Sequence, residues 1–298
     1  MARIALSVSS DYLPNWNVYE GLRELVQNYI DAQDDCGRKG EITYGGGTAR
    51  GRLFLRNPAA RPLTREALLF GVTTKADRDD QRGQFGEGMK VGTLALVRAG
   101  RSVTIRTQTE TWVASLSPAS DFGGRKVLTF DTRKRLTESD AVEIEIGPVE
   151  RKEWEEIRNA FMFMQEEEGE VTSRKGYTGA LLLDSKHRES VFAKGILIKK
   201  MEGLRWGYDL SMLTLNRDRS MVDEWDVRYQ ICNVLAEQHR AGTISTEDLL
   251  GLFVDNAWEA QSGSTWMYSG VVDKILLHLV SQRRNPFSKG MIITSNED

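Results

Sequence analysis

Apolar residues recur at helical spacing near the start of the chain and predict a helix over residues 15–34. Pro14 precedes this helix, Asn17 and Glu20 form an Asn-x-x-Glu variant of the capping box, and Gly37 follows its end. The apolar side chains gather on one side of the helix: Leu22, Leu25, Val26, Tyr29 and Ile30. The pattern therefore predicts one buried face and one polar face.

Alternating or β-branched runs predict strands in the first half of the chain, over residues 52–55, 103–107, 112–116, 126–130 and 142–146. A glycine-rich stretch lies between the first two of these runs and leads into a predicted helix over 89–99, which Gly100 closes. These elements predict a sheet with helices on one face.

The pattern changes after Pro148, where an acidic helix is predicted over 153–168. Strands are then expected over 179–184 and 191–199, helices over 222–240, 246–260 and 271–283, and a short strand in the tail at 290–298. A length of 298 residues suits two domains of about 150 residues each. We therefore expect domains at 1–148 and 149–298.

Composition narrows the class of protein. The chain is 40% hydrophobic and 28% charged with a formal net charge of −3, which is typical of a soluble globular protein and gives no general indication of nucleic-acid binding. A local basic groove remains open as an alternative. No run approaches the roughly 18 apolar residues of a membrane helix, and the start lacks a targeting pattern, so we expect no membrane contact and a cytoplasmic location.

Cysteine and histidine positions give no sign of a metal cage built from protein ligands alone. Cys36 and Cys232 are isolated, and neither lies near a histidine at metal-ligand spacing. The histidines stand far apart in the sequence, at His187, His239 and His278.

Two polar motifs stand out from this background. Glu24, Asn28 and Asp31 lie at i, i+4 and i+7 of the first helix, so at about 100° per residue they share one stripe. Alone, such a stripe is more often a solvated helix face. The second motif places glycines directly before a helix, where backbone N–H groups can approach phosphate oxygens; it comprises Gly83, Gln84, Phe85, Gly86, Glu87, Gly88, Met89 and Lys90. Alone, it is typical of a plain loop, because it matches neither a Walker A motif nor a dinucleotide fingerprint.

Together, Glu-x-x-x-Asn-x-x-Asp-Ala at 24–32 and the glycine loop resemble the Bergerat ATP-binding fold of the GHKL superfamily, which includes gyrase, heat-shock chaperones, histidine kinases and MutL. The resemblance implies an α/β (α+β) two-layer sandwich that binds ATP and Mg²⁺, followed by a smaller α/β segment with a helical C-terminal part. It implies that Glu24 is the general base and that Asn28 holds Mg²⁺. Asp31 and Ala32 would lie beside the nucleotide, with Asp31 supporting the helix, and residues 83–88, Met89 and Lys90 would contact the phosphates.

The chain departs from the family pattern at two positions. Where the family has an adenine-binding Asp, Leu55-Arg56-Asn57 ends in Asn57, whose carbonyl can accept one hydrogen bond from adenine. The family's later Gly-Thr is replaced by Asp140-Ala141. The stretch Gly71-Val72-Thr73-Thr74-Lys75 resembles the start of the family's ATP lid, so Lys75 is a candidate nucleotide contact.

The second half resembles the opening of the middle segment of the ninety-kilodalton heat-shock chaperones, over 191–199 and 213–219. The resemblance implies that Arg219 reaches the terminal phosphate, with Arg217 as the near alternative. The open alternative is a surface turn with local ion pairs.

The expected function is slow Mg²⁺-dependent ATP hydrolysis coupled to lid closure, with a homodimer or a protein partner. One alternative is a nucleotide-gated binding module with little hydrolysis. Another is the ATPase part of a DNA-handling assembly, against which the acidic balance argues mildly. A histidine kinase is the least favoured, because no preceding helical hairpin with a phosphoacceptor histidine is evident.

Overall fold

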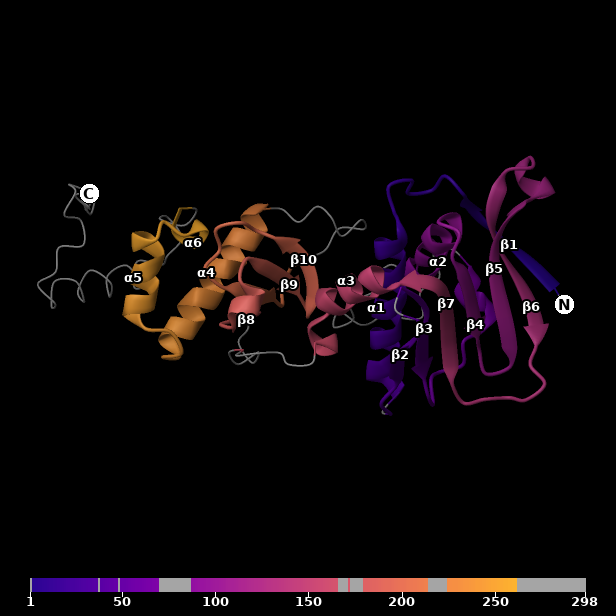
Figure 1. Cartoon of the computed structure of the whole chain (residues 1–298), viewed down its shortest axis with the longest axis horizontal. Coiled ribbons are helices and arrows are strands. Elements are labelled where there is room, and N and C mark those ends of the chain that lie inside the picture. Colours follow the sequence, from indigo (N-terminus) through magenta and orange to yellow (C-terminus); the bar gives the residue numbers. More distant parts are fainter. Residues whose placement is uncertain are drawn as a thin grey trace, which may run out of the picture. The chain divides into compact units, whose positions relative to one another are not determined.

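The first half of the chain forms an antiparallel sheet in the order β1-β6-β5-β4-β7-β3-β2 (Figure 1). Its strands are β1 (Ala2–Ser9), β2 (Glu41–Gly46), β3 (Arg50–Asn57), β4 (Ser102–Arg106), β5 (Glu110–Pro118), β6 (Lys126–Lys134) and β7 (Val142–Glu150). The computed structural model describes residues 2–36, 38–47, 49–69, 87–165, 171, 179–213 and 224–261.

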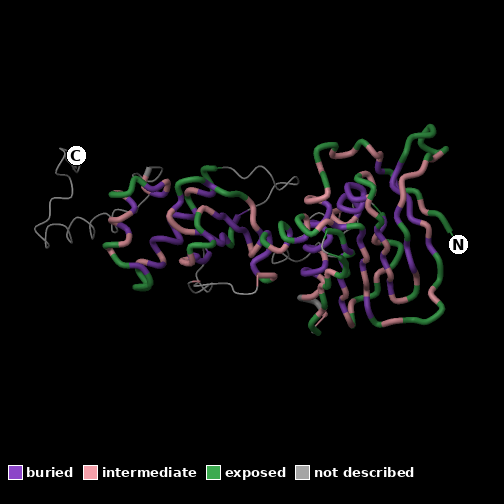
Figure 2. Tube along the Cα trace, viewed as in Figure 1, coloured by how far each residue is buried: buried purple, intermediate pink, exposed green. Residues whose placement is uncertain are grey.

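Two helices cover one face of this sheet. Helix α1 (Val18–Cys36) packs on β3 and on α2 (Gly88–Arg98), and α2 also contacts β4 and β5. The strands alternate accordingly: Leu53 and Leu55 of β3 are buried, whereas Arg52 and Phe54 face the open side. Figure 2 shows this alternation along the strands.

The start of α1 confirms the predicted capping box. The backbone N–H of Tyr19 donates to Asn17 Oδ1 at 2.7 Å, and the N–H of Asn17 donates to Glu20 Oε2 at 2.8 Å. These bonds satisfy donors that a helix start would otherwise leave unpaired.

The chain divides into two compact units between Ala160 and Phe161, whereas the sequence placed the boundary at 148. The difference is α3 (Arg151–Ala160), which follows β7 directly, packs against α1 and has Trp154 and Ile157 buried. The short 3₁₀ helices η1 (Arg65–Leu68) and η2 (Ser120–Phe122) complete the first unit.

The second unit is a smaller sheet with helices. Its strands β8 (Gly179–Leu182), β9 (Ser190–Ala193), β10 (Ile196–Lys200) and β11 (Gly207–Leu210) pair in the order β10-β9-β11-β8, with β9 and β11 parallel. The helical segments are η3 (Met162–Met164), η4 (Ser185–His187), α4 (Glu224–Arg240), α5 (Thr246–Val254) and α6 (Trp258–Gln261). Each unit mixes helices with a sheet, so the chain is of mixed α/β, or α+β, class. The predicted segments at 271–283 and 290–298 lie outside the described residues.

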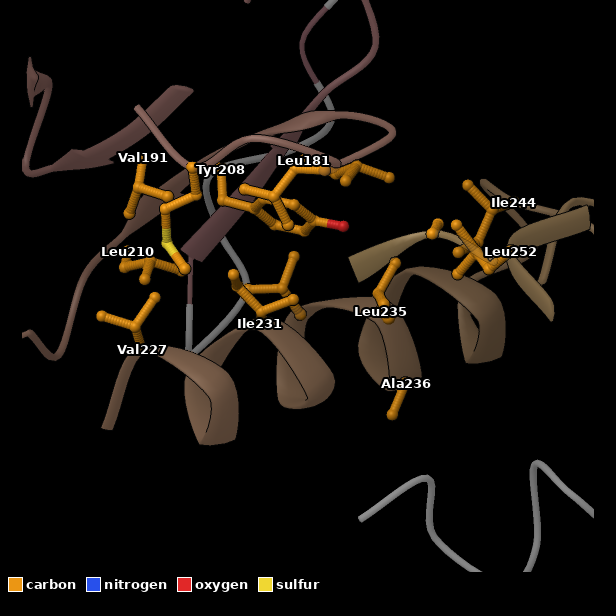
Figure 3. Packing of buried hydrophobic residues seen from close by; sticks show 14 of the residues in the cluster. Leu181, Val191, Tyr208, Leu210, Val227, Ile231, Leu235, Ala236, Ile244 and Leu252 are labelled. Atoms are coloured by element: carbon orange, nitrogen blue, oxygen red, sulfur yellow. The ribbon is translucent and has the colours of Figure 1, made fainter. Parts of the chain in front are cut away.

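Helix α4 supplies the core of the second unit. Val227, Ile231 and Leu235 point from α4 toward Tyr208, Leu210 and Leu181 of the sheet (Figure 3). The same core contains a buried polar pair, because Tyr208 Oη donates to Glu259 Oε1 at 2.8 Å. Burial raises the pKa of Glu259 above its ordinary value and raises the pKa of Tyr208 well above its ordinary value.

Candidate functional site

Helices α1 and α2 lie unusually close together because glycines face each other across their contact. A Cβ on Gly21 would lie 2.7 Å from Leu96 Cγ and 3.0 Å from the Gly92 carbonyl oxygen, and a Cβ on Gly92 would lie 2.8 Å from Glu24 Cβ. Later residues of α1 therefore meet earlier residues of α2, and the two helices run antiparallel with their backbones in close approach.

The glycine at the start of α2 brings that helix terminus to the polar stripe of α1. A Cβ on Gly88 would overlap Glu24 Oε2 and would lie 3.2 Å from Asn28 Nδ2. Only a residue without a side chain leaves room there for the carboxylate and the amide. Glu24 is 1% exposed, whereas Asn28 is partly exposed.

Asn28 has a defined orientation. Its Nδ2 donates to the backbone carbonyl of Glu24 at 2.7 Å. Because a carbonyl can only accept, the end of the amide that faces it is the nitrogen, and Oδ1 remains as the acceptor of this side chain.

The first turn of α2 has no side-chain cap. Glu87 is the N-cap residue and makes no capping hydrogen bond through its side chain. Its carbonyl accepts from both Lys90 N and Val91 N at 3.0 Å. Gly88 and Met89 stand in the first turn, where N–H groups have no acceptor within the helix, so this terminus offers donors and the positive end of the helix dipole.

Two side chains that flank Glu24 were not predicted as functional. Arg23 Nη2 lies 3.8 Å from Glu24 Oε1, and the Arg23 guanidinium lies 5.8 Å from the centre of the Tyr19 ring. Gln27 is 1% exposed, and neither end of its amide has a hydrogen-bond partner among the described residues. Gln27 stands three residues after Glu24 and so shares its side of the helix, which was the available signal; Arg23 is adjacent to Glu24 in sequence and gave no such signal.

Asn57 ends β3 and is anchored to α1. Its Nδ2 donates to the Tyr29 carbonyl at 2.9 Å, and its Oδ1 is buried without a donor from the described residues. The turn before β2 covers this oxygen: a Cβ on Gly40 would lie 2.6 Å from it, and the Gln33 amide bonds both the Gly40 N–H and the Arg38 carbonyl. The Asn57 amide is thus oriented with its nitrogen bonded to α1 and its oxygen kept as an acceptor.

The remaining candidates on these helices have distinct environments. Asp31 is 1% exposed, and Ala32 is half-buried. Lys90 is fully buried, and its Nζ donates to the carbonyls of Ala67 at 3.1 Å and Leu69 at 2.5 Å, at the end of η1. Burial lowers the pKa of Lys90. Its ammonium therefore fixes the chain after η1, a role that differs from the predicted phosphate contact.

Several predicted site residues lie outside the described residues: Lys75, Gly83, Gln84, Phe85, Gly86, Arg217 and Arg219. At the position of the missing Gly-Thr, Asp140 Oδ2 pairs with Arg38 Nη1 at 3.1 Å, and Ala141 is buried. The site that can be described therefore consists of Glu24, Asn28 and Asn57 with the start of α2.

A search of the described residues finds no group of three or more His, Cys, Asp or Glu side chains that could hold a metal ion. None of the described helices combines the length and apolar character that a membrane crossing requires. No model of a known protein family matches the chain, and no curated protein sequence matches it.

Proposed function

We propose that this chain is a Mg²⁺-dependent ATPase of the GHKL type, with a Bergerat fold in the first unit. The observation that supports the proposal best is the contact of the Glu24 carboxylate and the Asn28 amide with the uncapped start of α2 at Gly88. The carboxylate of the proposed general base and the Asn28 amide thereby lie beside the proposed anion-binding helix terminus.

Each of these groups has a task in phosphoryl transfer to water. The N–H groups of Gly88 and Met89 donate to phosphate oxygens, and the helix dipole favours the negative charge. The Glu24 carboxylate orients the attacking water and takes its proton. Close packing of α1 and α2 excludes bulk water from the carboxylate, which is 1% exposed.

The donor set fits a hard cation. Asn28 Oδ1 is an amide oxygen that stays available as an acceptor because Nδ2 donates to the Glu24 carbonyl, and oxygen ligands are what Mg²⁺ prefers. Asn28 would hold the ion together with phosphate oxygens and water. Bound Mg²⁺ neutralises phosphate charge and so eases attack on the terminal phosphorus.

Asn57 supports adenine as the base. Its Oδ1 keeps one acceptor, which matches the amino group of adenine and not the carbonyl of guanine. Because Gly40 covers this oxygen, the turn at 38–40 has to yield when a base binds. Hydrolysis would be slow and would drive closure of the segment that resembles a lid, with dimerisation or a protein partner as the output.

The test compares phosphate release from Mg·ATP by the wild type and by Glu24→Gln, with ATP affinity measured for both. We expect Glu24→Gln to lower kcat by about 100- to 10,000-fold with affinity retained, because it removes only the base. Glu20→Gln is the matched control, since Glu20 lies on the same helix and Gln also completes a capping box.

The outcomes separate the proposal from its alternatives. Equal turnover by the wild type and Glu24→Gln refutes the assigned base. Binding without turnover in the wild type identifies a nucleotide-gated module, and absence of ATP binding overturns the proposal. Turnover that rises with added DNA indicates a DNA-handling ATPase.

A further inference from the structure

A single arginine at the far end of α2 binds an entire loop by its backbone. Arg98 Nη1 donates to the carbonyls of Ser10 at 3.0 Å and Tyr12 at 2.9 Å. Its Nη2 donates to the carbonyls of Leu13 at 2.9 Å and Trp16 at 2.7 Å. All four terminal N–H bonds of the guanidinium are used, and all four acceptors lie in the connection between β1 and α1.

This loop does not hold its shape through backbone preference alone. Leu13 has a φ of 46°, a left-handed conformation that is unfavourable for a residue with a side chain. Hydrogen bonds from a charged donor are stronger than those between neutral groups, so the four together offset that strain. Arg98 is therefore the group that keeps four carbonyls turned toward one point.

The loop leads without a break into the helix that carries Glu24. The Trp16 N–H donates to the Leu13 carbonyl at 3.0 Å, and the Gly21 N–H donates to the Asn17 carbonyl at 3.1 Å. Glu24 follows on the same helix, about 10 Å beyond Asn17 at 1.5 Å per residue. A displacement of the loop is thus carried along α1 as a displacement of the Glu24 carboxylate.

Because α1 and α2 are antiparallel, both ends of α2 contact α1. Arg98 joins the C-terminus of α2 to the entry of α1, while Gly88 at the N-terminus of α2 touches Glu24 and Asn28. The clamp consequently sets how far α1 slides along α2. We propose that Arg98 is a positioning residue that keeps Glu24 in register with the start of α2, an inference that rests on the proposed ATPase function.

The decisive measurement is a double-mutant cycle on ATP turnover with Arg98→Ala and Glu24→Gln. Misplacing a catalytic group by about 1 Å can cost about 100-fold in rate, so we expect Arg98→Ala to lower kcat by about that factor with KM changed much less. In the Glu24→Gln background the same change should have no further effect, because Arg98 acts through Glu24. Independent losses in the two backgrounds overturn the proposal.

Arg101→Ala is the matched control. Arg101 follows α2 closely, but its Nη2 donates to Glu153 Oε1 of α3 at 2.8 Å and not to the loop. It should leave kcat near the wild-type value, and an equal loss in Arg101→Ala and Arg98→Ala refutes a specific clamp. Guanidinium at non-denaturing concentration should restore turnover to Arg98→Ala, whereas no rescue counts against the four-carbonyl site.

Amide hydrogen exchange tests the clamp without any reference to ATP. In Arg98→Ala we expect faster exchange at Tyr12, Trp16 and Gly21, whose N–H groups are bonded within the loop and the first turn of α1. Arg98→Lys keeps the charge but not the fork of donors, so its exchange rates should lie between those of the wild type and Arg98→Ala. This variant replaces Arg98→Ala in the test if the alanine variant fails to fold. Faster exchange with no wild-type turnover refutes the ATPase function alone, whereas unchanged exchange refutes the clamp.

Discussion

The contact at Gly88 makes a quantitative prediction for Gly88→Ala. The new Cβ would overlap Glu24 Oε2 and would lie 3.2 Å from Asn28 Nδ2. Moving helix α1 away from α2 would disrupt the close backbone packing at Gly21 and Gly92. The carboxylate is the end of a rotatable side chain, so it moves aside by roughly 1 Å, away from the start of α2.

The expected cost separates stability from activity. Overpacking costs about 1–3 kcal/mol, and replacing glycine by alanine in a helix returns up to about 1 kcal/mol. We therefore expect a net loss of about 0–3 kcal/mol in the free energy of unfolding. The same displacement should lower ATP turnover about 100-fold, since the base no longer meets the water beside the helix terminus.

Urea denaturation and phosphate release measure these two quantities on the same variant. Gly45→Ala is the control, because its Cβ would lie 3.9 Å from Phe54 in ordinary contact. Gly92→Ala should lose more stability than Gly88→Ala, because its Cβ meets Glu24 Cβ, which cannot rotate away. Wild-type turnover in a folded Gly88→Ala protein would falsify the geometry assigned to Glu24.

Two further predictions concern stability. Tyr208→Phe removes a buried donor to Glu259 and should lower the free energy of unfolding by about 1.5–3 kcal/mol; an unchanged urea midpoint contradicts this. Hydrogen bonds from Arg106 and Arg52 lower the pKa of Glu145 below its ordinary value of 4.5, so the unfolded chain binds that proton more tightly. The resulting stability is present above about pH 4.5 and is lost as pH falls through the lowered pKa; Glu145→Gln should weaken the acid dependence of the urea midpoint, and an identical dependence in both proteins refutes the assignment.

Sequence patterns within a few residues predicted the start of a helix and one strand of the large sheet. Asn17 and Glu20 identified the start of α1, and the run at 52–55 identified the strand β3. The edge strands β1 and β2 were missed because little of them is buried: β1 buries only Leu6 and Val8, and β2 ends in glycines that are typical of a turn. For β1, moreover, the partner strand β6 lies more than 100 residues later, and the sequence contains no signal for pairing across such a separation.

The candidate site shows the same division. Helical spacing alone put Glu24 and Asn28 on one stripe, and the glycine run indicated a close approach of backbone. Their meeting at Gly88 depends on tertiary packing. The Arg98 clamp was beyond prediction, because one side chain collects four carbonyls from a loop more than 80 residues earlier in the sequence.

The strand order has a consequence for how the protein is made. β1 pairs with β6 and β3 pairs with β7, so β1 has to wait for residues 126–134 and β3 for residues 142–150. Such long-range pairing is slow and leaves strand edges open during synthesis. The sheet is complete only after β7 has left the ribosome. Until then, β1 and β3 are the segments in greatest need of protection from aggregation.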